Sequence, residues 1–129
     1  MSKHNISKKD EYISLAPLGN ENVNQCMQLD KIALNGIWSR KHWENELSDK
    51  NRLCLGLFSD SHLIAMACGW IVLDEIQITV IAVHPLFQRK GFGKLILTKL
   101  LNLAKEKDAK KATLEVDSKN HKALHLYKS

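Results

Sequence analysis

The sequence is poor in cysteine and proline, and the shortage of cysteine limits what the chain can be. It has three cysteines and two prolines among 129 residues. Cys26, Cys54 and Cys68 are far apart, each lies in an apolar stretch, and no Cys-x-x-Cys pair occurs. An odd number of isolated cysteines favours buried thiols in a reducing compartment over a disulfide framework or a zinc site.

Long apolar runs are also missing. The longest, Leu63–Leu73, is well short of the ~18–20 residues that cross a bilayer. The first nine residues, Met-Ser-Lys-His-Asn-Ile-Ser-Lys-Lys, are polar and lack the apolar centre of a signal peptide. We therefore expect a cytoplasmic protein with no membrane association.

The composition is that of an ordinary globular domain. Of the 129 residues, 44% are hydrophobic and 26% are charged. We expect a flexible tail over residues 1–11 and one domain over residues 12–129. The net charge of +5 would suit a polyanionic ligand, such as a phosphorylated cofactor or a ribosome surface, but it does not choose between them.

The first half of the chain predicts one strand and two helices. Residues 12–18 alternate as a strand, and Asn20 can cap a helix that runs to about Ala33. Ser39 can cap a second helix over residues 40–47. Trp38 and Trp43 flank that cap at the spacing of a hydrophobic staple.

The second half predicts three hairpin strands and a crossover. Short polar turns join the strands, so the pairs should be antiparallel, and Pro85 ends the third. We expect an α/β (α+β) fold with a mixed, mostly antiparallel sheet, helices on both faces and one βαβ crossover. The expected elements are strands 53–58, 62–73, 76–83 and 112–116, a helix over 91–107, and a last helix capped by Ser118 or Asn120.

The segment between the third strand and the long helix is the most informative. It reads Gln88-Arg89-Lys90-Gly91-Phe92-Gly93-Lys94. The first amides of a helix have no partners within it and carry the positive end of its dipole, so they bind anions readily. Glycines at positions 91 and 93 would let the backbone approach a diphosphate, and Arg89, Lys90 and Lys94 add charge.

Two other phosphate-binding motifs fit this segment poorly. A Walker A loop needs Gly-Lys-Ser/Thr, but Lys94 is followed by Leu95 and its first glycine would fall on Gln88. A dinucleotide fingerprint needs a third glycine where Ile96 stands, although Glu115 could supply its acidic residue. The segment instead resembles the Gln/Arg-x-x-Gly-x-Gly/Ala loop of the GNAT acetyltransferases, which implies coenzyme A binding.

Two polar residues near the end of the sequence are catalytic candidates. Glu115 alternates with Leu114 and Val116, so it should occupy the opposite face of the strand from them. It is either an exposed strand residue or a general base whose pKa is raised by desolvation. Tyr127 is either a core tyrosine with a satisfied hydroxyl or a phenol that can donate a proton to a leaving thiolate.

The pattern of Leu114-Glu115-Val116, Asn120 and Tyr127 resembles the bacterial ribosomal-protein-alanine N-acetyltransferases. This resemblance implies that Glu115 accepts a proton, that Tyr127 donates one and that Asn120 contacts the cofactor. It also implies that Ile81, Ala82 and Val83 pair with the pantetheine arm, and that residues 88–94 hold the pyrophosphate. Members of that family continue with two more strands, so we expect this domain to be incomplete at its C-terminal end.

Other functions remain open. The amine could belong to a small metabolite, a drug or a lysine, and the chain could be a non-catalytic acyl-CoA-binding module or a ribosome-associated protein. Trp38, Trp43, Trp70 and Phe92 have core-like spacings, which argues against a platform for stacking RNA bases. His121 and His125 lie one helical turn apart but have no evident third ligand, so we expect no metal. We expect a monomer whose substrates are acetyl-CoA and the N-terminus of a protein.

Overall fold

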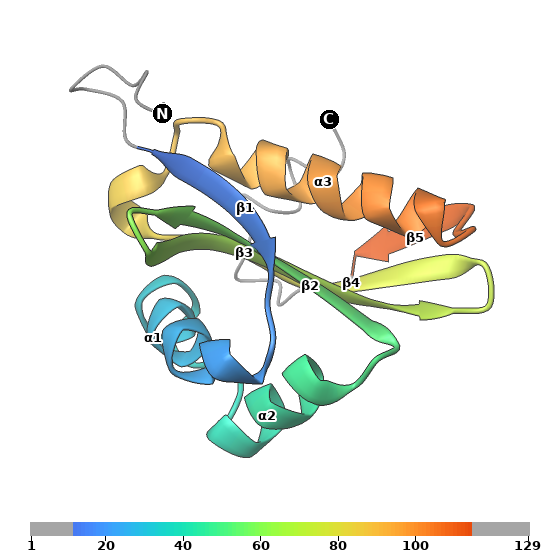
Figure 1. Ribbon diagram of the computed structural model, residues 1–129, viewed down its shortest axis with the longest axis horizontal. Helices are drawn as coiled ribbons and strands as arrows, with labels where there is room; N and C mark the ends of the chain where they lie inside the picture. The colour runs from blue at the N-terminus through green and yellow to red at the C-terminus, as the bar shows by residue number, and fades with distance from the viewer. Residues whose placement is uncertain (1–11, 115–129) are drawn as a thin grey trace.

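The computed structural model describes residues 12–114. The expected tail over 1–11, the end of the last strand and the final helix lie outside these residues. The described chain forms five strands, three α-helices and two 3-10 turns (Figure 1). In chain order these are β1 (Ile13–Pro17), η2 (Asn20–Asn22), α1 (Val23–Leu34), α2 (Arg40–Ser48), β2 (Arg52–Ser59), β3 (His62–Val72), β4 (Glu75–Val83), η3 (Pro85–Phe87), α3 (Phe92–Glu106) and β5 (Lys111–Leu114).

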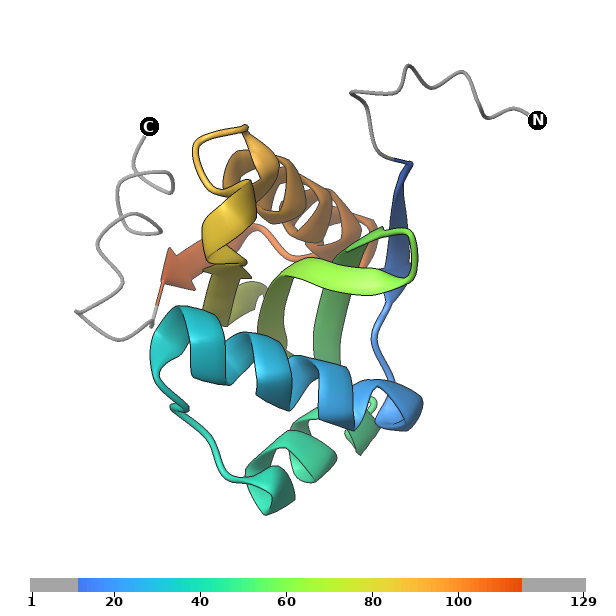
Figure 2. The same ribbon diagram turned by 90° about the vertical axis from the view of Figure 1, so that its left-hand side faces the viewer.

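The strands lie in one sheet in their chain order, β1-β2-β3-β4-β5. The first four pair antiparallel, and β5 pairs parallel to β4 after the crossover through α3. The predicted fold class, the hairpins and the βαβ unit are confirmed. Helix α3 covers one face of the sheet and helices α1 and α2 cover the other (Figures 1 and 2).

Each face of the sheet has its own apolar core. On the α3 side the helix buries Ile96, Leu97 and Leu100 against β2, β3 and β4. On the α1 and α2 side Trp43, which is fully buried, is the largest side chain of the core. All three cysteines are buried and free, as expected from their apolar surroundings. Burying apolar surface on both faces is the main favourable term that holds the layers together.

The first helix does not begin where the sequence suggested. Asn20 does not cap an α-helix; it opens the 3-10 turn η2, and α1 starts only at Val23. The reason is local: the side chain of Asn22 accepts a hydrogen bond from the backbone of Gly19 at 2.9 Å, which tightens this turn. The second helix begins as predicted. The Ser39 side chain accepts from the backbone N–H of His42 at 3.1 Å.

Strand β4 contains a bulge that turns its side chains over. Its pairing with β3 runs to Ile78 and resumes at Val80, so Thr79 is an extra residue. Before the bulge, Ile76 and Ile78 point to the α3 core. After it, Val80 points to the α1 core and Ile81 to the α3 core. The bulge therefore decides which residues of the second half of β4 face each layer.

Candidate functional site

The C-terminal end of β4 presents backbone groups to the side of the strand away from β3. His84 N–H donates to the Ile64 carbonyl at 2.7 Å. In an antiparallel ladder such hydrogen-bonded pairs alternate with non-hydrogen-bonded pairs, so Val83 and its partner Ala65 form a pair of the second kind. The N–H and C=O of Val83 therefore point away from β3, toward the β5 side of the sheet.

Ile81 and Ala82, the other two residues expected to pair with the pantetheine arm, differ in the direction of their backbone groups. By the same alternation the backbone of Ile81 points with Val83, whereas Ala82 is in register with Met66 and its groups point to β3. In the described residues, β5 pairs with β4 from Glu75 to Ile78, just before the bulge. The outward N–H and C=O of Val83 lie beyond this described pairing, at the end of β4 that leads into the loop.

The predicted diphosphate loop connects this strand end to α3. Gly91 is the N-cap of α3 and adopts a left-handed conformation, with φ of +88°. The helix's first internal bond runs from Leu95 N–H to the Gly91 carbonyl at 3.0 Å. The amides of Phe92, Gly93 and Lys94 therefore have no partner within the helix, and they point out of its N-terminal end.

The loop backbone contains two left-handed residues, Arg89 and Gly91. Arg89 is left-handed as well, with φ of +65°, which is uncommon for a residue with a side chain. Left-handed residues in a turn let neighbouring N–H groups point into one concavity, which suits an anion. A Cβ placed on Gly91 would meet no atom within 4 Å, so there is open space beside its backbone.

The side chains of the loop divide into two groups. Arg89, Lys90 and Lys94 are exposed, and their charges face solvent around the helix end. Lys90 Nζ lies 5.8 Å from the centre of the Phe87 ring, a cation–π contact. Gln88 instead turns back to the strand, and its Nε2 donates to the Val83 carbonyl at 3.1 Å. The structure thus brings the two predicted halves of the cofactor site together through Gln88.

Both catalytic candidates lie beyond the last described residue, Leu114. Glu115, Asn120 and Tyr127 lie outside residues 12–114, and so do His121 and His125. Leu114, which precedes Glu115, is in register with Ile78 and packs against the α3 core.

Three features of the site escaped the sequence prediction. They are the bulge at Thr79, the left-handed Arg89 and the contact between Gln88 and Val83. Of these three features, only the bulge corresponds to a pattern in the sequence. Ile76 and Ile78 are even-numbered residues of the α3 face, whereas Ile81 and Val83 continue that face at odd numbers.

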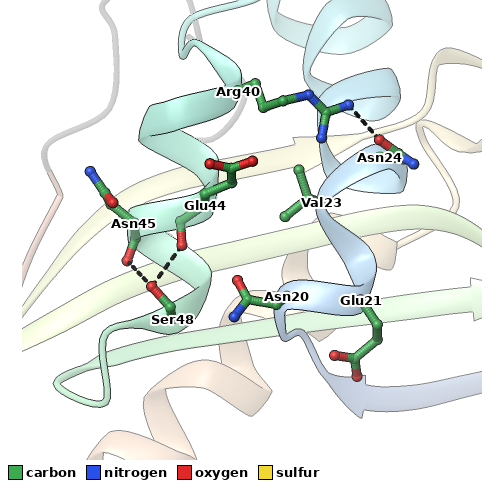
Figure 3. A pocket seen from close by; sticks show the side chains of 8 residues that line it. All are labelled: Asn20, Glu21, Val23, Asn24, Arg40, Glu44, Asn45 and Ser48. Carbon is green, nitrogen blue, oxygen red and sulfur yellow. Dashed lines mark hydrogen bonds between the residues drawn. The ribbon is translucent and has the colours of Figure 1, made fainter.

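Two hollows lie near the α1 side of the molecule. One, of about 460 Å³, lies between the start of α1 and α2 and is lined by polar groups (Figure 3). Arg40 there donates to the Asn24 side chain, and Ser48 donates to the Glu44 carbonyl at 2.8 Å. The other, of about 570 Å³, borders the loop through His84, Leu86 and Phe87. Neither is lined by residues 88–94.

A family model for the acetyltransferase (GNAT) family matches residues 23–129. The chain belongs to this family. It is therefore an acetyltransferase by descent, and the loop over residues 88–94 lies within the matched part. No helix in residues 12–114 is long and apolar enough to cross a membrane. In the same residues no group of three or more His, Cys, Asp or Glu side chains is placed to hold a metal ion.

Relatives and solved structures agree with the family. The chain is 30% identical over 116 residues to the ribosomal protein bS18-alanine N-acetyltransferase of Salmonella typhimurium, covering 90% of this chain and 78% of that protein. The crystal structure of the ribosomal-protein-S18-alanine N-acetyltransferase from Escherichia coli superposes with a TM-score of 0.81 at 26% identity, covering 91% of this chain and 75% of that one.

A more distant structure shares the fold. An N-acetyltransferase from Thermoplasma acidophilum, solved in complex with coenzyme A, gives a TM-score of 0.71 at 22% identity. The match covers 91% of this chain and 87% of that one. This acetyltransferase therefore has the GNAT fold.

Proposed function

We propose that this chain transfers the acetyl group of acetyl-CoA to the N-terminal amine of a ribosomal protein that begins with Ala or Ser. The observation that carries the proposal is the joining of two features. The outward backbone of β4 at Val83 leads within a few residues to the open amides at the start of α3. The acceptor is inferred from the names of the relatives in Salmonella and Escherichia coli. A ribosomal acceptor would place the enzyme in the cytoplasm.

The described residues fit the coenzyme. Its diphosphate would lie on the amides of residues 91–94, beside the open space at Gly91, with Arg89, Lys90 and Lys94 around it. Its pantetheine arm would run along Ile81, Ala82 and Val83, as the resemblance to the family implies. Asn120 would add a contact from outside the described residues. The coenzyme A complex of the distant Thermoplasma structure supports the same choice of ligand.

The reaction needs a deprotonated amine beside the thioester. An α-amino group has a pKa of about 7.7–8.0, so only part of it is nucleophilic near neutral pH. Holding both substrates side by side removes much of the entropic cost of their encounter. Glu115 would accept the proton of the attacking amine, directly or through water. It follows Leu114, the last described residue of β5, which is in register with Ile78 just before the bulge.

Two further groups would stabilise the later stages. The N–H of Val83 points to the side on which the acetyl carbonyl would lie, so it could donate to the developing oxyanion. Tyr127 would then protonate the sulfur of the departing coenzyme A. No covalent enzyme intermediate is required. Cys68 is fully buried, and a hydrogen bond with Cys54 together with burial raises the pKa of its thiol, so it is a poor nucleophile.

The test is a thiol-release assay with acetyl-CoA and a panel of acceptors. Peptides that begin with Ala or Ser should release coenzyme A far faster than polyamines, aminoglycosides or the same peptides with blocked N-termini. Faster turnover of a polyamine or aminoglycoside would contradict the proposed acceptor, although the chain would still act as an N-acetyltransferase. Binding of acetyl-CoA without turnover on any amine would favour a non-catalytic module.

Two variants test the assigned roles. Glu115→Gln should lower kcat at neutral pH by about 100-fold or more, since general bases contribute about that much. Tyr127→Phe should lower kcat much more than it lowers the affinity for acetyl-CoA. An equal loss of kcat and of affinity, measured by initial rates and calorimetry, would remove the proton-donor role from Tyr127.

A further inference from the structure

The side chain of Gln88 links the two halves of the candidate site. Its Nε2 donates to the Val83 carbonyl at 3.1 Å, across five residues of chain. Gln88 also ends the turn η3, where its N–H points to the Pro85 carbonyl at 3.5 Å. The residue is therefore fixed at both its backbone and its side chain, directly before the left-handed Arg89 with which the diphosphate loop turns.

The bond acts on a residue with two outward groups. The carbonyl and the N–H of Val83 both point away from β3, because Val83 and Ala65 form a non-hydrogen-bonded pair. Gln88 occupies the carbonyl, so that group already has a donor from the protein itself. The N–H of Val83 is then the backbone group that can donate to a bound substrate. The strand and the hydrogen bond from Gln88 together set its direction.

We propose that Gln88 is a positioning residue for acetyl transfer, which it serves by holding Val83 rather than by binding the diphosphate. The inference rests on the proposed function, in which the Val83 N–H donates to the oxyanion. Gln88 ties the end of β4 to the diphosphate loop, so a coenzyme seated on the loop has its thioester placed at a fixed distance from that N–H. Because the Gln88 side-chain amide donates to the Val83 carbonyl, it does not point to the phosphates.

The competing role makes a different kinetic prediction. If Gln88 bound the diphosphate directly, its loss would weaken coenzyme A binding and leave kcat at saturation almost unchanged, because the contact would be equally strong in the ground state and the transition state. If Gln88 positions Val83, its loss lowers kcat and leaves the affinity for coenzyme A nearly constant. The two effects are separable in one set of measurements.

The experiment compares Gln88→Met, which keeps the length and removes the donor, with Gln88→Arg, which restores a donor. We expect Gln88→Met to lower kcat by about three- to tenfold, the effect of one net hydrogen bond. Its Kd for coenzyme A, measured by calorimetry, should change by less than about twofold. Gln88→Arg should recover most of kcat. Gln28→Met, on the exposed side of α1, is the matched control and should change neither quantity.

A readout that does not depend on activity separates this inference from the proposed function. The ¹³C chemical shift of the Val83 carbonyl should move in Gln88→Met and return in Gln88→Arg. If the wild-type chain neither binds coenzyme A nor transfers acetyl, the proposed function fails, whatever this shift does. A larger loss of coenzyme A affinity than of kcat, or an unmoved Val83 shift, overturns the positioning role. Gln88→Ala replaces the Met variant if that one does not fold.

Discussion

The carboxylate of Asp30 accepts a hydrogen bond from the indole N–H of Trp43 at 2.9 Å, across the buried interface of α1 and α2. Its two oxygens also accept from the backbone N–H groups of Ile37 at 2.8 Å and Trp38 at 3.2 Å. The Asp30 side chain is only 1% exposed. A buried charge is costly unless it is satisfied, and here three donors from the α1–α2 connection and α2 satisfy it.

This network predicts a large loss of stability in Asp30→Ala. Three donors, the buried Trp43 indole and two part-buried backbone N–H groups, would lose their acceptor at once. Each unsatisfied buried group costs about 1–3 kcal/mol, partly offset by water entering the site. We expect the free energy of unfolding to fall by about 2–4 kcal/mol, measured by urea unfolding with unchanged m-value. Glu106→Ala, which removes an exposed carboxylate from the last turn of α3, should change it by less than about 0.5 kcal/mol. A loss below 1 kcal/mol in Asp30→Ala would mean that the network contributes little.

The burial of the Asp30 carboxylate could not be predicted from the sequence. Helical periodicity identified the apolar face of α1 through Val23, which is buried, but it gave no reason to place a carboxylate there. The donors that permit it come from residues seven to thirteen positions later, and only the folded chain brings them together. The staple, by contrast, depends on local spacing and was predictable. The rings of Trp38 and Trp43 lie 4.7 Å apart, edge to face.

The candidate site also has some features that the sequence predicts and others that it does not. The loop composition and its place before an amphipathic helix indicated an anion site, since both are local properties. The bulge at Thr79 and the bond from Gln88 to Val83 depend on register and on contacts between segments, so composition did not reveal them. The fold order was predictable because short polar turns force hairpins, and a helix between two strands forces a crossover.

Gly91→Ala should damage both the fold and coenzyme A binding. An alanine at φ of +88° is strained, although its Cβ would meet no neighbour within 4 Å. We expect the free energy of unfolding to fall by about 1–2 kcal/mol. The backbone can relieve this strain by leaving the left-handed region. Relief of that kind turns the first amides of α3 away from the ligand, so the Kd for coenzyme A should rise by about tenfold or more in calorimetry.

Gly36→Ala is the matched control for this variant. Gly36 is also left-handed, with φ of +73° and no atom within 4 Å of an added Cβ, but it lies in the connection after α1. It should lose a similar amount of stability and keep its affinity for coenzyme A. If both variants lose affinity equally, the effect comes from general destabilisation and Gly91 has no special role in the anion site.

The buried thiols predict a loss of stability in alkali. Burial raises the pKa of the Cys26 thiol from 9.0 to about 12, and Cys54 and Asp30 nearby add to the shift. Above pH 9.0 the unfolded chain releases this proton while the folded chain keeps it, so stability falls as pH rises toward 12. The slope is about 1.4 kcal/mol per pH unit. The group has almost no effect of this kind well below pH 9.0, where both states are protonated.

Cys26→Ala isolates this contribution. Urea unfolding under reducing conditions should show that the wild-type chain loses about 2 kcal/mol more than the variant between about pH 7 and pH 10.5. The variant will itself be less stable at pH 7, because it removes a fully buried side chain, so the comparison is between pH differences within each protein. Equal pH dependence in the two proteins would show that Cys26 ionises normally in the folded state.

The charges around the diphosphate loop predict a salt-dependent affinity. Lys90 is exposed, and its amine lies 5.8 Å from the centre of the Phe87 ring, which keeps the charge close to the start of α3. Lys90→Gln should raise the Kd for coenzyme A by about three- to tenfold at low ionic strength. The difference should shrink in about 1 M salt, where the screening length is about 3 Å. Lys99→Gln removes an equally exposed charge further along α3 and should alter the Kd by less than about twofold at either ionic strength. If the two variants weaken binding equally, the coenzyme responds to the net charge of the protein, and the start of α3 does not supply the specific phosphate contact.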